Sequence, residues 1–354
     1  MSSREKVLVA MSGGVDSSFA ALSLRDRGFK VFGLHFRLWG SGAEPEAHSL
    51  TEESARQTAQ ELGIEFRVLD LRRKFRDEVV SYFVNEYLSG RTPNPCALCN
   101  PRIKFQSLVE LAEEIPAAFI ATGHYARISS EAGNREYQLL SAKDRDKDQS
   151  YFLAFLPRAI LRRVIFPLGE MKKNEVKKYS REMKLAAASR PESQDICFAL
   201  AENYPAVIES LRPEAKRPGD IVDLSGKKIG SHRGIYHYTI GQRRGLGLNR
   251  ENGYVIAIEA GRNQVVVDKE SYLFHRKMQV ASVNWLDDTS LPFECQVKIR
   301  HRSAKADARV EAAEQGKLLV SFAKPQRAIT PGQAAVFYDG ERVIAGAWIE
   351  KALD

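Results

Sequence analysis

The sequence predicts an α/β fold, with a doubly wound parallel sheet at the N-terminus followed by two small β-rich domains. Short apolar stretches alternate with amphipathic helical stretches up to residue 211, which is typical of parallel strands covered by helices on both faces. After Arg212-Pro213, short β-rich segments alternate with turns, and long helical periodicity is absent. We therefore expect three domains, at 1–211, 212–275 and 276–354.

Each predicted element follows from its own pattern. The apolar runs predict strands over Lys6–Met11, Val31–Phe36, Glu65–Leu71 and Ala118–Gly123. The amphipathic stretches predict helices over Asp16–Arg27, Glu52–Leu62, Asp77–Leu88, Phe105–Glu114, Asp148–Leu156 and Lys173–Lys184. An extended excursion at Tyr137–Ser141 and a hairpin at Gly219–Gly230 complete the series. Ligands of such sheets bind beyond the carboxyl ends of the strands.

Composition narrows the class of protein. The chain has 354 residues and 44% hydrophobic residues, as in an ordinary globular protein of two or three domains. No apolar stretch approaches membrane-spanning length, and Met1–Lys6 lacks the apolar core of a signal peptide, so we expect a cytoplasmic protein. A net charge of +8 indicates a polyanionic partner such as RNA. The basic cluster Lys172–Lys178 is explained equally well by a solvated helix face, whereas Arg243-Arg244 and Lys298–Arg302 favour nucleic acid.

The first strand runs directly into a glycine-rich loop, Ser12–Ser18, which opens the first helix. This arrangement builds an anion site from backbone N–H groups and the helix dipole, and Gly13 and Gly14 let the backbone approach a phosphate. Asp16 is unusual beside a polyanion unless it caps the helix or holds Mg²⁺. No Gly-Lys-Ser/Thr follows, so the loop is not a Walker A motif. It resembles instead the PP-loop of enzymes that split ATP into AMP and pyrophosphate, which predicts an ATP site; the alternative is a simple turn before a capped helix.

The cysteines point to a second kind of chemistry. Cys96 and Cys99 lie in the proline-rich stretch Thr92–Pro101, which we expect to form a stiff loop outside regular helix. With Cys197, they are too few for structural zinc unless Cys295 or a histidine joins them, and Cys295 lies in a strand-like segment where a buried thiol is commoner. Three thiolates suit an iron–sulfur cluster with one open iron, and two suit a redox pair that passes through a persulfide and a disulfide. These alternatives remain open at this point.

Taken together, longer stretches of the chain resemble the tRNA-specific 2-thiouridylase family, in its Cys-x-x-Cys variant, and the match covers nearly the whole chain. The stretches that carry the resemblance are Met11–Ser17, Gly90–Asn100, Ile103–Phe105, Ala121–Arg127, Lys147–Leu153, Pro191–Phe198, Tyr238–Gly247 and Thr330–Tyr338. The resemblance implies a PP-loop ATP-pyrophosphatase domain of the adenine nucleotide α-hydrolase type, a central β-rich tRNA-binding domain and a C-terminal β-barrel.

The implied reaction replaces oxygen by sulfur at C2 of the wobble uridine, position 34 of the tRNA. A pyrimidine carbonyl oxygen is a very poor leaving group, so the need for ATP is chemically reasonable: adenylation lets the oxygen leave as AMP. The base must also be turned out of the anticodon stack, which requires a body that grips the stem. The two β-rich domains, with Arg243-Arg244 on a glycine-flanked loop, are the expected grip.

The resemblance also implies roles for individual residues. The expected ATP site is Ala10, Met11, Ser12, Gly13, Gly14, Val15, Asp16, Ser17, Phe36 and Gly123. The expected catalytic residues are Asp16, Cys99 and Cys197, with Cys197 receiving persulfide sulfur. The target base is expected at Asn94, Pro95 and Cys96, and the tRNA at His124, Lys147, Asp148, Gln149, Arg300, His301 and Gln333.

One departure bears on the cofactor. Many family members have aspartate where this chain has Cys96, and are thought to use a persulfide relay that ends in a disulfide. The Cys-x-x-Cys pair with a distant cysteine resembles cluster-dependent thiolases, in which three cysteines hold a 4Fe-4S cluster whose open iron carries hydrosulfide. We expect Cys96, Cys99 and Cys197 to hold such a cluster, because Cys96 has no evident task in the relay. A relay between Cys197 and Cys99 is the alternative.

Other expectations complete the prediction. A thiolate nucleophile needs a lowered pKa, which the flanking cations Arg91, Arg102 and Lys104 would supply. The sulfur donor is a cysteine desulfurase, a sulfur-relay protein or free sulfide. Two rival functions are another ATP-adenylating ligase that forms a C–N bond, and a non-catalytic RNA-binding or iron–sulfur sensing protein. The first would not require three cysteines, and the intact loop argues against the second.

Overall fold

The computed structural model describes residues 5–40, 46–130, 136–183, 185–189, 196–198, 204–248 and 253–354. The chain divides into two compact units, which are described separately. The first unit comprises Met1–Val79, Cys96–Phe198 and Glu341–Val343, and the second comprises Val80–Pro95, Ala199–Gly340 and Ile344–Asp354. None of the helices in the described part of the chain is long and apolar enough to span a membrane.

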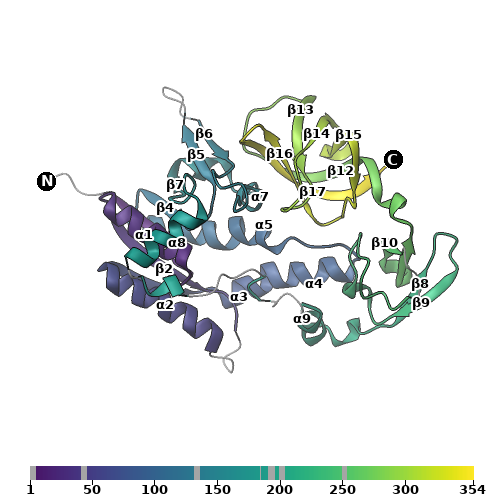
Figure 1. Ribbon diagram of the computed structural model, residues 1–354, viewed down its shortest axis with the longest axis horizontal. Helices are drawn as coiled ribbons and strands as arrows, with labels where there is room; N and C mark the ends of the chain where they lie inside the picture. The colour runs from purple at the N-terminus through teal and green to yellow at the C-terminus, as the bar shows by residue number, and fades with distance from the viewer. Residues whose placement is uncertain are drawn as a thin grey trace. The chain divides into compact units, whose positions relative to one another are not determined.

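A five-stranded sheet in the order β3-β2-β1-β4-β7 forms the centre of the first unit (Figure 1). Every pairing in it is parallel, so the predicted parallel sheet is confirmed. Its strands are β1 (Lys6–Ala10), β2 (Lys30–Arg37), β3 (Glu65–Asp70), β4 (Phe119–Thr122) and β7 (Val164–Ile165). A separate hairpin pairs β5 (Arg127–Ser130) with β6 (Tyr137–Leu140).

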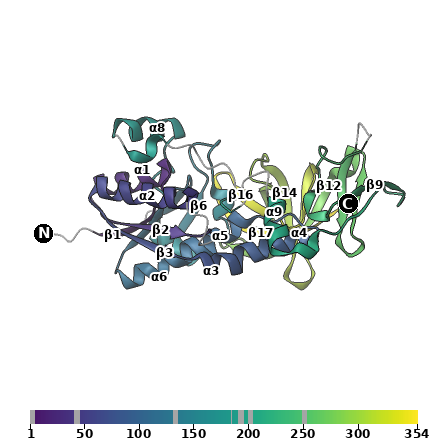
Figure 2. The same ribbon diagram turned by 90° about the horizontal axis from the view of Figure 1, so that it is seen from below.

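Helices cover both faces of this sheet: α1, α2 and α8 lie on one side and α6 on the other (Figure 2). The helices of the first unit are α1 (Val15–Asp26), α2 (Glu46–Leu62), α3 (Arg72–Phe75), α5 (Pro95–Cys99), α6 (Gln106–Glu114), α7 (Ser150–Leu153) and α8 (Lys173–Glu182). The core between sheet and helices contains Val7 and Val9 of β1 and Ala20 and Leu24 of α1, whose side chains are fully buried. Burial of these apolar faces is what fixes the layers.

Two predicted helices differ from the observed ones. The predicted helix at 77–88 is longer and irregular: α3 continues through a π-helix, η1 (Arg76–Val80), into α4 (Ser81–Leu88). The predicted helix at 148–156 is only α7, because Asp148 is not helical. Its Oδ1 accepts the backbone N–H of Ser150 at 3.2 Å and of Ala142 at 2.9 Å, so the residue ends a turn and precedes the helix.

The second unit contains two β structures, which confirms the prediction of β-rich architecture after the sheet. The first is a four-stranded sheet in the order β10-β11-β8-β9. Its strands are β8 (Gly219–Val222), β9 (Lys228–His232), β10 (Tyr254–Glu259) and β11 (Gln264–Asp268), and β8 and β9 form the predicted hairpin. Helices α4 and α9 (Tyr204–Leu211) belong to the same unit.

The other β structure is a six-stranded barrel, which confirms the expected C-terminal β-barrel. The strands follow the order β12-β15-β14-β13-β16-β17, and pairing of β12 with β17 closes the barrel. They are β12 (Phe274–Trp285), β13 (Phe293–Lys298), β14 (Ala306–Ala312), β15 (Leu318–Arg327), β16 (Ala334–Asp339) and β17 (Arg342–Leu353). Alternation of buried Ala308 and Val310 with exposed neighbours along β14 places one face of the strand in the barrel core.

Candidate functional site

The glycine-rich loop connects the carboxyl end of β1 to the N-terminus of α1. Ser17 fixes its shape, because its Oγ accepts the Ser12 N–H at 3.0 Å and donates to the Gly14 carbonyl at 3.1 Å. Gly13 has φ +77, and a Cβ there would lie 2.1 Å from the Thr51 carbonyl oxygen. Glycine is therefore required at 13 both for the backbone conformation and for the close approach of α2.

The other expected ATP-site residues lie around this loop. Ala10 ends β1, Met11 is buried, and Phe36 is half-buried in β2. Gly123 follows β4, and a Cβ on it would lie 2.7 Å from the Ser17 backbone nitrogen. The ends of β1 and β4 thus meet the first turn of α1, as expected for a ligand site beyond the carboxyl ends of parallel strands.

Asp16, in the first turn of α1, is held by two side chains that come from distant parts of the chain. The Lys173 Nζ donates to both carboxylate oxygens at 2.7 Å, and the Tyr125 hydroxyl donates to Oδ1 at 2.8 Å. The Lys173 side chain is 6% exposed, whereas that of Asp16 is 33% exposed. The carboxylate therefore neutralises a buried cation beside the loop while keeping part of its surface accessible; its expected role toward Mg²⁺ remains a prediction.

The segment expected to contact tRNA at 147–149 supports this ion pair. Gln149 Oε1 accepts the Tyr125 N–H at 2.9 Å, and the Gln149 N–H donates to the Tyr125 carbonyl at 2.8 Å. Asp148 is buried and holds the turn before α7. Lys147 lies in that turn, with its N–H donating to the Asp144 carbonyl at 3.2 Å. The Asp148 and Gln149 side chains are thus used in protein contacts, and their contact with tRNA remains a prediction.

The cysteine pair lies in a helix, so the expected stiff loop outside regular helix is wrong. Cys96 and Cys99 belong to α5, which continues through a π-helix, η2 (Asn100–Phe105), into α6. Pro95 begins α5, where a missing N–H costs no helical hydrogen bond. Pro101 lies in the π-helical turn, a wider turn that accommodates a residue unable to donate within a regular α-helix. The two thiols are consequently one helical turn apart on the same face.

The charge of one lysine acts on the pKa of all three thiols. The positive charge of Lys104 acts to lower the pKa of Cys96, Cys99 and Cys197, and their negative charges raise the pKa of Lys104 above its usual value against the effect of its burial. Lys104 has neither a carboxylate partner nor a hydrogen bond within the described ranges. Its charge acts on the three thiols and on the His124 imidazole.

Burial nevertheless outweighs this cation, so the expected lowering of the thiol pKa values is wrong. Desolvation raises the pKa of Cys99 to about 11 and that of Cys197 to about 12, and it raises the pKa of Cys96 as well. Cys96 and Cys197 expose surface while protein crowds their other sides, and Cys99 is buried. The resting thiols are thus protonated, and Lys104 limits the free energy needed to ionise them.

His124, expected at the tRNA, is a neutral side chain in this unit. Burial, aided by the charge of Lys104, lowers its pKa to about 3. Its Nδ1 lies 2.7 Å from Thr122 Oγ1, and its ring packs on Phe105 and Phe166 at 6.2 and 6.3 Å. A neutral imidazole does not attract phosphate, so any contact of His124 with RNA would be a hydrogen bond or a stacking contact.

The remaining expected residues lie in the second unit. Arg300 Nη2 donates to the Ala328 carbonyl at 2.8 Å and to Thr330 Oγ1 at 2.6 Å. Gln333 Nε2 donates to the carbonyls of Thr92 and Pro93, both at 3.0 Å. This amide fixes the backbone just before the expected base-contacting residues, of which Asn94 and Pro95 are buried; His301 is half-buried. Contacts of these residues with tRNA remain predictions.

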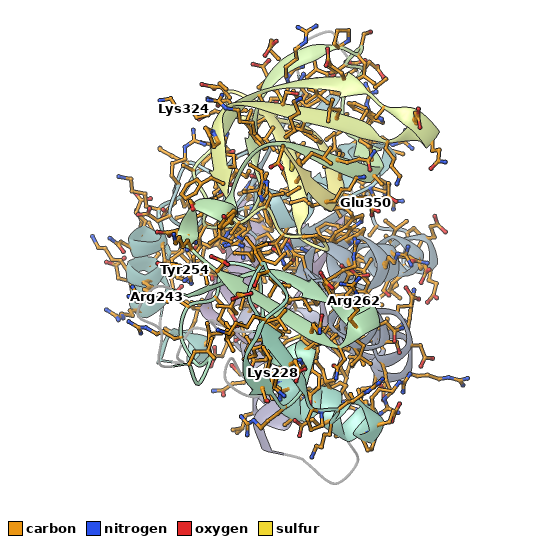
Figure 3. All side chains as sticks on the ribbon, turned by 90° about the vertical axis from the view of Figure 1, so that its right-hand side faces the viewer. Lys228, Arg243, Tyr254, Arg262, Lys324 and Glu350 are labelled. Carbon is orange, nitrogen blue, oxygen red and sulfur yellow. The ribbon has the colours of Figure 1, made fainter. Side chains whose placement is uncertain are left out.

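Basic side chains gather with an aromatic ring on one face of the second unit. Arg243 and Arg327 lie over the Tyr254 ring, 5.9 and 5.3 Å from its centre. In Figure 3, Arg243 and Tyr254 lie together, whereas the other labelled basic residues, Lys228, Arg262 and Lys324, lie apart from them. Lys228 and Arg262 pair with Asp220 and Glu259, so part of this charge is neutralised.

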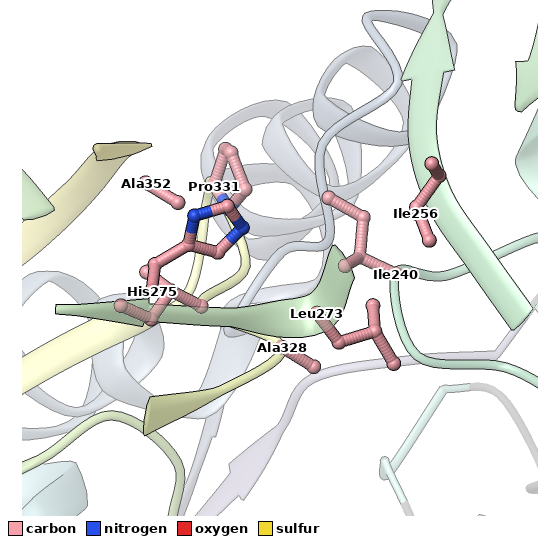
Figure 4. Close-up of a pocket in the computed structure, with 8 residues that line it drawn as sticks. Ile240, Ile256, Leu273, His275, Ala328, Pro331 and Ala352 are labelled. Carbon is pink, nitrogen blue, oxygen red and sulfur yellow. The ribbon is translucent and has the colours of Figure 1, made fainter. Parts of the chain in front are cut away.

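A small apolar pocket lies in the second unit, next to the Ala328 carbonyl that Arg300 contacts. It has a volume of about 70 Å³ and is lined by Ile240, Ile256, Leu273, His275, Ala328, Ile329, Pro331 and Ala352 (Figure 4). Since a cavity that binds benzene measures about 150 Å³, the pocket is too small for a nucleotide or a base.

Sequence reasoning missed two residues that the structure brings to Asp16 of the glycine-rich loop. Lys173 was interpreted only as part of a basic helix face, yet it shares the buried face of α8 with Val176 and Ser180, at helical spacing. That spacing was a readable signal. Tyr125 gave none, because its hydroxyl reaches Asp16 only through the tertiary fold.

Comparisons with known proteins agree with this architecture. Three family models match: "tRNA methyl transferase HUP domain" over residues 5–201, "tRNA methyl transferase PRC-barrel domain" over 207–269 and "Aminomethyltransferase beta-barrel domain" over 275–349. A protein of Chloroflexus aggregans named tRNA-specific 2-thiouridylase MnmA is 45% identical over 98% of both chains. A second, tRNA-specific 2-thiouridylase MnmA 2 of a Thermoanaerobacter species, is 43% identical over 100% of both chains.

A solved structure titled as the U34-tRNA thiolase NcsA of Methanococcus maripaludis with its 4Fe-4S cluster covers 60% of this chain and 67% of its own. It is 19% identical, with a TM-score of 0.37. The family-model matches and the identities to the curated relatives, over essentially the full length, decide the assignment. The chain belongs to the tRNA-specific 2-thiouridylase family of enzymes.

Proposed function

We propose that this chain is a tRNA-uridine 2-sulfurtransferase. It would use ATP to adenylate the C2 oxygen of the wobble uridine, and then replace that oxygen by sulfur to give 2-thiouridine, AMP and pyrophosphate. The observation that carries the proposal is that one compact unit holds both the glycine-rich loop at the end of β1 and three thiols around a shared lysine. The relatives named 2-thiouridylase support it.

The loop supplies the activating half of the reaction. Backbone N–H groups at the start of α1 form a cradle of donors for ATP phosphates, and the Ser12 and Ser17 hydroxyls hold the shape of the loop. In the adenylation step, the C2 oxygen attacks the α-phosphorus, a new O–P bond forms and pyrophosphate leaves. Lys173 is a buried cation beside the loop, and we propose that it passes from Asp16 to the departing pyrophosphate when Asp16 takes up Mg²⁺.

The form of sulfur delivery depends on whether the thiols suit a metal centre. Among the described residues, no three histidine, cysteine, aspartate or glutamate side chains come together closely enough to hold a metal ion. Lys104 places a positive charge beside the three thiols, which favours their anionic forms. The 4Fe-4S cluster expected at Cys96, Cys99 and Cys197 therefore remains a prediction, and we derive no step through it.

We propose instead the relay that the sequence left as the alternative. An external persulfide donor loads Cys197 with a sulfane sulfur. The Cys99 thiolate attacks the Cys197 sulfur, the S–S bond of the persulfide breaks, and the released hydrosulfide attacks C2 while the C2–O bond to AMP breaks. A Cys99–Cys197 disulfide remains, and an external thiol reductant restores the two thiols. Lys104 favours the thiolate and persulfide anions that these steps need.

RNA binding is proposed for the basic face of the second unit. The Arg243–Tyr254–Arg327 stack offers an aromatic surface and the guanidinium group of Arg243, while that of Arg327 pairs with Glu270 at 2.8 Å. A net charge of +8 favours a polyanion. We also propose a cytoplasmic location. The relay requires a persulfide donor, for which we propose a cysteine desulfurase or a sulfur-relay protein, whereas free sulfide would serve only the cluster form.

The experiment that tests this function combines two measurements on the same sample. Purified protein, MgATP and tRNA are assayed for pyrophosphate release, and the recovered tRNA is analysed for 2-thiouridine after addition of a persulfide donor. We expect pyrophosphate release only with tRNA, and thiolation only with both ATP and donor. Absence of tRNA-dependent pyrophosphate release would exclude the proposed function and favour a binding protein.

Two further measurements separate the forms of sulfur delivery. Iron and sulfide analysis of anaerobically purified protein is compared with its thiolation rate. The relay predicts full thiolation activity without iron, and it predicts that Cys96→Ala is active. Cys99→Ala and Cys197→Ala should each be inactive in either form of sulfur delivery. Loss of activity in Cys96→Ala together with stoichiometric iron would restore the cluster.

A further inference from the structure

Cys197 and the next residue lie in opposite environments. The Cys197 thiol is exposed, whereas the Phe198 ring is only 5% exposed. The ring contacts two aromatic side chains of the first unit: it packs edge-on against Phe75 at 5.5 Å and at a tilt against Trp39 at 5.8 Å. These three rings form what we term the aromatic anchor.

The anchor is attached to the sheet. Trp39 lies two residues after the end of β2, and Phe75 ends α3, which begins two residues after β3. Phe75 is fully buried, and its N–H donates to the Leu71 carbonyl at 2.8 Å. Phe198 therefore packs on groups whose position is set by neighbouring strands of the sheet.

Cys99 is fixed from its own next residue in a similar way. Asn100 is 1% exposed, and its Nδ2 donates to the Phe152 carbonyl at 3.1 Å. This bond connects the start of η2 to α7. Each of the two cysteines is thus followed in the chain by a residue whose buried side chain packs against, or bonds to, other parts of the first unit.

We propose that Phe198 is a positioning residue that holds the Cys197 thiol beside Cys99, so that the two sulfur atoms react as an intramolecular pair. Consecutive Cα atoms are about 3.8 Å apart, so fixing Phe198 confines Cys197 to a small volume. Confinement raises the effective concentration of one thiol at the other, and release of the ring lowers it. The use of this pair in sulfur transfer rests on the proposed function, but the positioning itself does not.

Thiol–disulfide exchange measures the effective concentration directly. Oxidised glutathione converts the Cys99 and Cys197 thiols to one disulfide and two reduced glutathione molecules, so no further reactant is needed. The full chain is prepared with Cys96→Ser and Cys295→Ser in every arm, equilibrated in glutathione buffers, and the Cys99–Cys197 disulfide is quantified by peptide mass spectrometry.

We expect Phe198→Ala to lower the effective concentration about tenfold or more, and Phe75→Ala to lower it as well. Phe198→Leu, which keeps an apolar side chain of similar size, should fall between Phe198→Ala and the parent. Phe29→Ala is the matched control, because Phe29 packs edge-on against Phe119 at 5.9 Å in the same unit but outside the anchor. It should leave the disulfide equilibrium unchanged.

An unchanged disulfide equilibrium in folded Phe198→Ala, or an equal fall in Phe29→Ala, would overturn the proposal. If Phe198→Ala does not fold, Phe198→Leu decides: an equilibrium equal to the parent overturns it, and a severalfold fall supports it. The measurement needs neither ATP nor tRNA. A parent protein that shows Phe198-dependent disulfide formation but no tRNA thiolation would contradict the proposed function and leave the positioning role intact.

Discussion

The Asp16–Lys173 pair allows a quantitative prediction. Asp16→Ala leaves the Lys173 ammonium, 6% exposed, without the carboxylate that lies 2.7 Å away. Removing one partner of a buried ion pair costs about 3–5 kcal/mol, and an exposed pair contributes about 0–1 kcal/mol. Because a third of the Asp16 side chain is exposed, water can reach the abandoned ammonium, and we expect a loss of about 2–3 kcal/mol in the free energy of unfolding.

Lys173→Met should cost less than Asp16→Ala. It removes the charge but keeps an apolar chain of similar length, and the partly exposed Asp16 retains the Tyr125 hydroxyl at 2.8 Å. We expect a loss of about 1 kcal/mol, and a coupling energy of about 1–2 kcal/mol in the double variant. Urea unfolding followed by circular dichroism measures all four proteins, with Lys178→Gln, an exposed position of the same helix, as the control. A coupling energy within about 0.3 kcal/mol of zero would refute the reasoning.

Ligand binding to the same variants tests the proposed exchange of partners. MgATP at one hundred times its dissociation constant should stabilise the parent by about 2.7 kcal/mol. Asp16→Ala should lose this gain, since the proposed magnesium ligand is gone, and Lys173→Met should retain part of it. A full gain in Asp16→Ala would remove Asp16 from the ATP site.

Three further predictions concern the surroundings of the loop and the thiols. Lys104→Gln removes the charge that lowers the pKa of Cys99, so alkylation of Cys99 by iodoacetamide at pH 8 should slow about three- to tenfold, whereas an unchanged rate would contradict the role of Lys104. The pKa of His124 is lowered from 6.5 to about 3, so below pH 6.5 the unfolded chain binds a proton that the folded chain does not. The free energy of unfolding should therefore fall by up to about 1.4 kcal/mol per pH unit below pH 6.5. His124→Asn should abolish this contribution, which is measured by comparing unfolding at pH 7 and pH 5. Gly123→Ala places a Cβ 2.7 Å from the Ser17 nitrogen and should cost about 1–3 kcal/mol and weaken ATP binding measured by calorimetry, while Gly261→Ala, with open space around it, should do neither.

How far the sequence predicted this structure depends on how local each feature is. The β1 strand, the Gly13 turn and α1 follow from neighbouring residues, and they form as expected. The helix through Cys96 was missed because Pro95 was interpreted as a helix breaker, although the first turn of a helix tolerates proline. The π-helical turn at Pro101 has no reliable sequence signal.

Features that depend on long-range contacts were out of reach. The thiol pKa values were expected to be low because cations flank the cysteines in the sequence. Arg91, however, pairs with Glu86 and Glu350 in the second unit, and burial dominates the thiols. A neighbouring cation lowers a thiol pKa and desolvation raises it, and only the folded environment gives the relative size of the two effects.

The contacts of Gln149 change what its position in the chain implies. It was expected to contact tRNA, yet its side chain accepts the Tyr125 N–H at 2.9 Å, and Tyr125 in turn donates to Asp16. Gln149→Ala should therefore release Tyr125 and weaken MgATP binding in the absence of any RNA, by about threefold to tenfold for the loss of one or two hydrogen bonds. Gln149→Glu keeps an acceptor at the same place and should bind MgATP nearly as the parent does. If both variants bind MgATP normally but lose affinity for tRNA in a filter-binding assay, then Gln149 acts on the RNA and its contact with Tyr125 is incidental.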